Sequence, residues 1–191
     1  MKTNQENQKI KKYLEQLSAH IVTSNSNIKK LIKIKKKIIK TKNTKNKVLI
    51  FGNGGSSAIA SHFSIDLINK IGIRCLNFSD DALLTCFAND YGFHKWIYKA
   101  IDLFCDRNDV IIFISSSGQS KNMIEGINLA KKKKINNLIT FTGGKKNNPL
   151  SKKGNINLWV NSKIYNHIEN AHQIWLLSIV DSIKLNKLKF K

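Results

Sequence analysis

The chain has three cysteines, one proline, few acidic residues and no long apolar run. No run approaches the ~18 apolar residues of a membrane-spanning helix, and the first eight residues lack the apolar segment of a signal peptide. We therefore expect no membrane span and a cytoplasmic protein. Cys75, Cys86 and Cys105 show no Cys-x-x-Cys spacing, so we expect buried free thiols and neither a disulfide nor a structural zinc.

Acidic residues number only 12 against 33 basic ones, which gives a net charge of +21. A charge of this size suggests a nucleic-acid partner. However, Arg74 and Arg107 are the only arginines, whereas proteins that read bases and phosphates favour the bidentate arginine fork. Lysine runs such as residues 131–134 fall where solvated helix faces are expected. We therefore interpret the charge as a solvated surface and expect no nucleic-acid partner.

Three of the 10 glycines fall in one short stretch, directly after the apolar run Val48–Phe51. The stretch reads Gly52-Asn53-Gly54-Gly55-Ser56-Ser57 and then passes into a helical pattern. Glycines allow tight turns and let a ligand approach bare backbone N–H groups. A helix N-terminus adds unpaired donors and a partial positive charge, which suit a phosphate or polyol oxygen.

A second turn of the same kind follows the apolar run at residues 110–114. It reads Ser115-Ser116-Ser117-Gly118-Gln119-Ser120, with Ser120 in the N-cap position of the next predicted helix. Neither turn has the spacing of a dinucleotide fingerprint or the Gly-Lys-Ser/Thr of a P-loop. Each turn alone is also typical of an ordinary connection between a strand and a helix. Together they suggest one phosphorylated small molecule held between them.

Short apolar runs alternate with helical patterns along the chain. We predict one long or two consecutive amphipathic helices over residues 5–41 and further helices over 58–71, 81–89, 91–103, 123–134 and 167–188. Strands are expected at 48–51, 74–77, 110–114, 138–142 and 156–160. This alternation predicts the α/β class, with one parallel sheet flanked by helices on both faces. We expect a single domain, in which residues 1–46 form an N-terminal helical segment and residues 47–191 the main part.

Three blocks of the sequence, in order, carry a resemblance to a known family. They are residues 52–56 with His62, residues 88–93 and residues 114–120, and together they resemble the phosphoheptose isomerases of the sugar-isomerase (SIS) domain superfamily. The resemblance implies a single SIS domain with a flavodoxin-like three-layer sandwich and extra helices at both termini. It also implies a homotetramer with active sites at the subunit interfaces. The implied activity converts sedoheptulose 7-phosphate to a heptose 7-phosphate for lipopolysaccharide or capsule precursors.

The resemblance also assigns the residues that contact the phosphosugar substrate. The first turn is expected to hold the sugar chain, the second turn the phosphate, and the middle block the sugar hydroxyls. Gln173 lies on the same helical face as Glu169 and is placed with them. The expected substrate contacts are Asn53, Gly54, Gly55, Ser56, Asn89, Asp90, Ser115, Ser116, Ser117, Ser120 and Gln173.

The family's catalytic cluster, which also binds zinc in many members, matches His62, Asp66, Glu169 and Leu177. His62 and Asp66 lie four residues apart on one helix face. A glutamate of the family is shortened to Asp66, a glutamine becomes Glu169, and a histidine becomes Leu177, which can neither bind a metal nor transfer a proton. His62, Asp66 and Glu169 could still supply three zinc ligands. Alternatively, Glu169 is the base for enediol chemistry with no metal.

The alternative function is a SIS module without catalysis, which binds a phosphosugar or acts as an adaptor like the family's replication-initiator-associating proteins. Leu177 and the positive charge favour this alternative. An isomerase needs a base that moves a proton between C1 and C2 of the sugar, and Glu169 is the residue that separates the two hypotheses.

Overall fold

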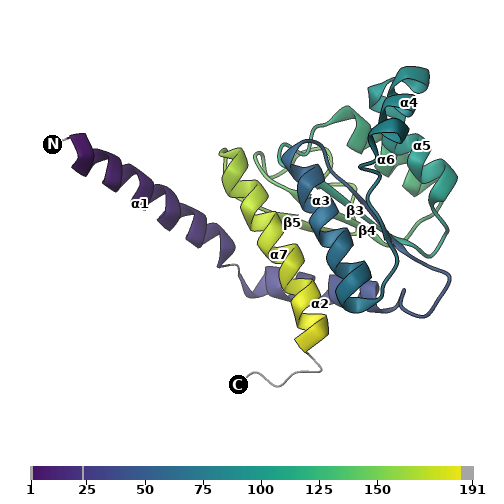
Figure 1. Ribbon diagram of the computed structural model, residues 1–191, viewed down its shortest axis with the longest axis horizontal. Coiled ribbons are helices and arrows are strands. Elements are labelled where there is room, and N and C mark those ends of the chain that lie inside the picture. Colours follow the sequence, from purple (N-terminus) through teal and green to yellow (C-terminus); the bar gives the residue numbers. More distant parts are fainter. Residues whose placement is uncertain (1, 23, 186–191) are drawn as a thin grey trace.

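The computed structural model describes residues 2–22 and 24–185 of the chain. Within them, five strands form one sheet in the order β2-β1-β3-β4-β5, and all neighbouring strands are parallel (Figure 1). The chain runs from β1 outwards to β2 and then returns to β3 on the other side of β1. The strand order therefore reverses between β1 and β3, which is where open α/β sheets hold their ligands. The strands are β1 Val48–Phe51, β2 Cys75–Leu76, β3 Val110–Ser115, β4 Leu138–Thr142 and β5 Ile156–Trp159.

Helices cover both faces of the sheet (Figure 1). One face packs against α2, α3 and α7 through a core that includes Ile50, Ile112 and Phe63. The other face packs against α4, α5 and α6 through a core that includes Phe51 and Phe113. The predicted three-layer α/β fold is confirmed. The helices are α1 Lys2–Ile21, α2 Asn25–Ile39, α3 Gly55–Asp66, a π-helix Leu67–Ile71, α4 Asp81–Tyr91, a 3-10 helix Phe93–Lys95, α5 Trp96–Phe104, α6 Lys121–Lys132 and α7 Tyr165–Leu185.

Strand β3 lies at the centre of the sheet and is buried along its whole length. Its side chains alternate between the two cores, because successive residues of a strand point to opposite faces. This double burial explains why the strands read as continuous apolar runs in the sequence.

Several predicted boundaries are wrong. The helix predicted over 91–103 is interrupted, because Gly92 takes a φ of +83° and ends α4. The N-terminal pattern does form two consecutive helices, one of the two arrangements expected, and Ser24 caps the second by accepting a hydrogen bond from the backbone N–H of Asn27. The predicted strand 74–77 shortens to Cys75–Leu76 at the sheet edge. The end of the last predicted helix at Leu188 lies outside the described residues.

The cysteines are free thiols, as expected, but they are not all buried. Burial raises the pKa of Cys75 to about 12, and burial also raises that of Cys105 to about 12. Cys86 lies on the exposed side of α4, so the prediction of a buried thiol is wrong there.

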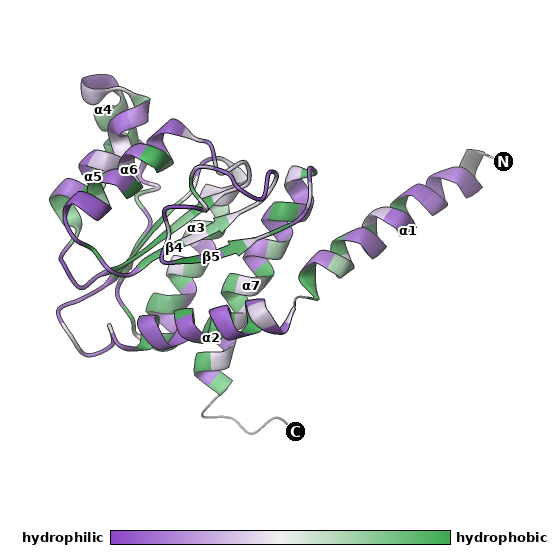
Figure 2. Ribbon diagram, turned by 180° about the vertical axis from the view of Figure 1, so that it is seen from behind, coloured by the Kyte–Doolittle hydropathy of each residue, from purple (hydrophilic) through white to green (hydrophobic). Residues whose placement is uncertain are grey.

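Helix α1 projects from the body of the molecule (Figures 1 and 2). It contacts α7, where the ring of Tyr13 lies 4.3 Å from that of His167. On either side of Tyr13 along the helix, Ile10 is 62% exposed and Leu14 is 55% exposed. The helix thus presents apolar side chains that the rest of the described chain does not cover. Among the described residues, no helix has the length and apolar character needed to cross a bilayer.

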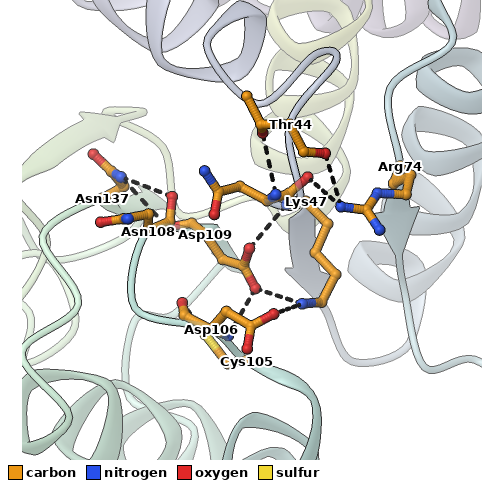
Figure 3. A network of polar contacts seen from close by, with 9 residues as sticks. Thr44, Lys47, Arg74, Cys105, Asp106, Asn108, Asp109 and Asn137 are labelled. Carbon is orange, nitrogen blue, oxygen red and sulfur yellow. Dashed lines mark hydrogen bonds and ion pairs between the residues drawn. The ribbon is translucent and has the colours of Figure 1, made fainter.

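The amino ends of β1 and β3 are joined by a polar network (Figure 3). Asp109 is fully buried and accepts hydrogen bonds from the backbone N–H of Lys47 at 2.8 Å and of Asp106 at 2.9 Å. The ammonium of Lys47 pairs with the carboxylates of Asp106 and Asp109. The hydrogen bond from Lys47 holds the pKa of Asp106 below the usual range. The network holds β1 and β3 together at their amino ends, whereas the glycine and serine turns follow their carboxyl ends.

Candidate functional site

The first turn joins the end of β1 to the start of α3. Gly52 has no room for a side chain, because a Cβ there would lie 2.2 Å from the carbonyl oxygen of Ser56. Gly54 occupies the N-cap position of α3 with a φ of +53°, a conformation that L side chains rarely adopt. The glycines thus let the chain fold tightly into α3, where the backbone N–H groups of Ser56 and Ser57 donate to the carbonyls of Asn53 and Gly54 within the turn. The partial positive charge of this helix N-terminus favours a negatively charged or polar oxygen nearby.

The second turn joins β3 to α6 and is built by its own serines. Ser115 Oγ accepts a hydrogen bond from the N–H of Gly118 at 3.1 Å, and Gly118 has a φ of +64°. Ser120 occupies the N-cap position, but its hydroxyl does not cap α6. It lies 3.4 Å from the hydroxyl of Ser115 instead. The expected capping role is therefore wrong, and the hydroxyl remains directed into the turn.

The two turns meet at one small cavity of about 140 Å³. Asn53 and Ser56 line it from the first turn, and the serines line it from the second. Helix α7 contributes Glu169 and Tyr165. Sequence reasoning missed Tyr165, because nothing in the sequence shows that the first residue of α7 reaches the turns. The full lining is Asn53, Ser56, Ile114, Ser115, Ser116, Ser117, Ser120, Tyr165 and Glu169.

An adjoining cavity of about 430 Å³ shares Ser116, Ser117 and Tyr165 with the first. Its lining adds Lys145 and Lys163, which place two cations beside the second turn. A larger cavity of about 560 Å³ lies between the α1–α2 junction and β5. It contains none of the predicted site residues, so size alone does not identify the site. Of these three cavities, the smallest is the one that both turns and Glu169 line.

Glu169 lies at the N-terminus of α3. A Cβ on Gly55 would lie 2.3 Å from Glu169 Oε2, so the carboxylate occupies the space that the missing side chain leaves. Ser116 Oγ donates to Glu169 Oε1 at 3.4 Å. The partial positive charge of a helix N-terminus attracts a carboxylate. These contacts place an acid/base group at the cavity formed by the two turns.

His62, Asp66 and Gln173 form a separate row between α3 and α7, in which His62 is exposed and Asp66 is buried. Gln173 Nε2 donates to His62 Nδ1 at 3.4 Å, so the proton of a neutral His62 is on Nε2. That nitrogen lies 3.7 Å from Asp66 Oδ2, which also pairs with Lys70 at 2.8 Å. These residues are outside the lining of the cavity. The helical spacing places His62 and Asp66 on one face, but packing does not bring Glu169 to them.

The predicted zinc ligands His62, Asp66 and Glu169 do not fit a metal in this arrangement. Across residues 2–22 and 24–185, no three histidine, cysteine or acidic side chains are grouped as metal ligands. Asp66 pairs with Lys70, whereas Glu169 packs on Gly55, about three helical turns away from Asp66 along α3. A catalytic zinc usually has three protein ligands, and this chain alone does not gather them.

Asn89 and Asp90 lie near the end of α4, where both are exposed. Asn89 Nδ2 donates to Asp90 Oδ1 at 3.0 Å. Neither residue lines the cavity between the turns. Helix α4 covers the face of the sheet opposite α3 and α7, so these two expected substrate contacts stand apart from the others within one chain.

His172 is fully buried behind the site, where its Nε2 donates to the carbonyl of Thr142 at 3.2 Å. Burial lowers its pKa to about 4, although the bond to Thr142 raises it. A neutral, buried ring at this position fixes α7 against β4. The role is structural, and it sets the register at which Glu169 reaches α3.

Comparison with known proteins agrees with this architecture. The family model of the SIS domain matches residues 8–143. A phosphoheptose isomerase of Thermodesulfovibrio yellowstonii is 36% identical over 132 residues, which are 66% of this chain and 65% of that protein, just under two thirds of its length. A phosphoheptose isomerase of Helicobacter pylori is 33% identical over 77% of this chain and 79% of that protein.

The fold also matches a solved structure. A phosphoheptose isomerase from Francisella tularensis superposes with a TM-score of 0.83 over 96% of this chain and 98% of that one, at 23% identity. At this identity the likeness shows the fold, whereas the sequence matches show the relationship. The chain therefore has a SIS domain and belongs to the family of the phosphoheptose isomerases.

Proposed function

We propose that this chain is an aldose–ketose isomerase that converts sedoheptulose 7-phosphate to a heptose 7-phosphate. The names of its relatives support the reaction. The observation that carries the proposal is the position of Glu169, whose carboxylate lines the same cavity as the serine turn. A phosphate cradle and a base in one cavity are the two parts that this reaction needs.

The second turn is the proposed phosphate cradle. Ser115, Ser117 and Ser120 supply hydroxyls around the cavity, and the N-terminus of α6 begins directly after them. Hydroxyls and backbone N–H groups at a helix N-terminus can hold a dianion without a lysine inside the cavity. Lys145 and Lys163 in the adjoining cavity add long-range attraction for the phosphate.

The first turn is the proposed sugar-binding segment. Asn53 and Ser56 line the cavity, and the space beside the backbone of Gly54 is open. Glu169 is the proposed base. It takes the proton from C1 of the ketose to form the enediol and returns it to C2, while a second proton moves between O2 and O1. Ser116, which donates to Glu169, holds the carboxylate in place.

His62, Asp66 and Gln173 are proposed to act where two copies of the chain meet. In this row His62 is exposed, Gln173 is partly exposed and Asp66 is buried, and apolar side chains of the projecting helix α1 are exposed as well. Packing of the terminal helices between subunits would cover both. We infer a homotetramer in which the neighbouring copy closes the site. The row would then contact the sugar, and Asn89 and Asp90 could reach it from another subunit.

The test is isomerase activity with sedoheptulose 7-phosphate for the wild type and for Glu169→Gln. The variant keeps the side-chain size but removes the base, so turnover should fall by ~10²–10⁴-fold, with a modest change in substrate affinity. Glu125→Gln is the matched control. Glu125 lies on α6 outside the lining of the cavity, where it pairs with Lys95, and the Glu125→Gln variant should keep wild-type turnover.

The second candidate is a phosphosugar-binding module without catalysis. Leu177 favours it, because this side chain on α7 cannot transfer a proton. Wild-type protein that binds the phosphosugar but shows no turnover with any heptose or hexose phosphate would establish this function instead. Under either function we propose a cytoplasmic protein that takes part in heptose metabolism for lipopolysaccharide or capsule and has no nucleic-acid partner.

A further inference from the structure

The two turns of the site are joined by a pair of side-chain amides. Asn53 Nδ2 donates to Asn122 Oδ1 at 3.1 Å, and Asn122 Nδ2 donates to Asn53 Oδ1 at 2.9 Å. Asn53 belongs to the turn after β1, whereas Asn122 lies in the first turn of α6, directly after the serine turn. The reciprocal pair therefore bridges the proposed sugar-binding segment and the proposed phosphate cradle.

The backbone fixes the orientation of this pair. Asn122 Oδ1 also accepts a hydrogen bond from the backbone N–H of Met123 at 2.9 Å. Because an amide nitrogen cannot accept that bond, the Asn122 amide has only one orientation, with its nitrogen towards Asn53. This in turn fixes the Asn53 amide. One N–H and one lone pair of Asn53 are used, and the others remain for a ligand in the cavity that Asn53 lines.

Asn122 itself is 2% exposed and does not line the cavity. It can therefore affect a ligand only through Asn53 or through the distance between the two turns. A buried amide without its partner is costly, so the pair stays formed in the folded protein. We propose that Asn122 is a positioning residue, which orients the Asn53 amide towards the sugar and fixes the sugar-binding turn against the phosphate cradle. This inference rests on the proposed function for the identity of the ligand.

A double-mutant cycle tests whether Asn122 acts through Asn53. The variants are Asn53→Ala, Asn122→Ala and the double variant. For each we would measure kcat and KM with sedoheptulose 7-phosphate, and the melting temperature of the protein. A misplaced binding group costs about 10- to 100-fold in kcat/KM, and we expect a loss in this range for Asn122→Ala. In the Asn53→Ala background the same substitution should cause no further loss, because the residue it orients is gone.

Two further variants separate positioning from folding. Asn122→Asp keeps the size and the acceptor for Met123 but loses the donor to Asn53, so it should lower kcat/KM even if Asn122→Ala does not fold. Asn128→Ala is the matched control on the exposed side of α6 and should behave as wild type. Additive losses in the cycle, or wild-type kcat/KM for Asn122→Asp, would overturn the proposal.

The test also separates this inference from the proposed function. If the wild type binds sedoheptulose 7-phosphate without turning it over, the isomerase proposal fails and the same cycle is measured on Kd by calorimetry. Non-additive losses in Kd would then support the positioning role on its own. Absence of binding by the wild type would overturn both proposals.

Discussion

Acidification should destabilise the protein through His172. This ring is fully buried, and burial lowers its pKa from 6.5 to about 4. Nε2 donates to the carbonyl of Thr142, so a second proton would go to Nδ1, which has no hydrogen-bond partner among the described residues. The folded protein thus excludes a proton that the unfolded chain binds freely. Stability from the neutral ring is complete above pH 6.5 and is lost as the pH falls towards 4.

The expected size follows from the shift of the pKa. One unit corresponds to about 1.4 kcal/mol, so the loss between pH 6.5 and pH 4 is about 3 kcal/mol. Typical domains have a free energy of unfolding of about 5–15 kcal/mol, so the effect is large enough to measure by urea denaturation. The series should run from pH 7.5 to pH 4.5 at one protein concentration, because association would otherwise change the apparent stability.

The variant His172→Gln isolates this contribution, because an amide can still donate to Thr142 but does not titrate. The free energy of unfolding of the wild type minus that of the variant should fall as the pH is lowered. His20, whose pKa is lowered by burial and by His167, is present in both proteins, and its contribution cancels in the difference. His94→Gln, at an exposed position, is the matched control. A difference that does not change with pH would refute the reasoning.

Three further predictions concern the site and the assembly. Gly55→Ala places a Cβ where Glu169 Oε2 lies, so it should displace the carboxylate and reduce kcat about as strongly as Glu169→Gln; wild-type kcat would contradict the assigned position. Ser117→Ala combined with Ser120→Ala should weaken phosphosugar binding, measured by calorimetry, while the melting temperature stays nearly unchanged. Unchanged affinity would contradict the assignment of these serines to the phosphate. Light scattering at micromolar concentration should give the mass of a tetramer, and a monomeric mass would contradict packing through the terminal helices.

The sequence predicted the layers of this fold because buried parallel strands and amphipathic helices each leave a periodic pattern. It also predicted which turns lie at the ends of β1 and β3, since glycine and serine mark them. The interruption at Gly92 was missed, because one glycine in an apolar helical pattern does not show which conformation it takes. Asn122 and Tyr165 were missed for another reason. The sequence of the first turn of a helix does not show whether one of its polar side chains contacts a neighbouring turn.

The register between α3 and α7 is the feature that sequence patterns could not supply, and it decides the chemistry available to one chain. Packing brings Glu169 opposite Gly55 and Gln173 opposite His62. At 1.5 Å per residue, the seven residues from Gly55 to His62 separate these two levels by about 10 Å along α3. Asp66 lies a further turn away. The cluster that the family motif suggests is therefore divided between Glu169 at the serine cavity and the row of His62, Asp66 and Gln173. In the assembly that we propose, a second copy of the chain supplies the contacts that close this row.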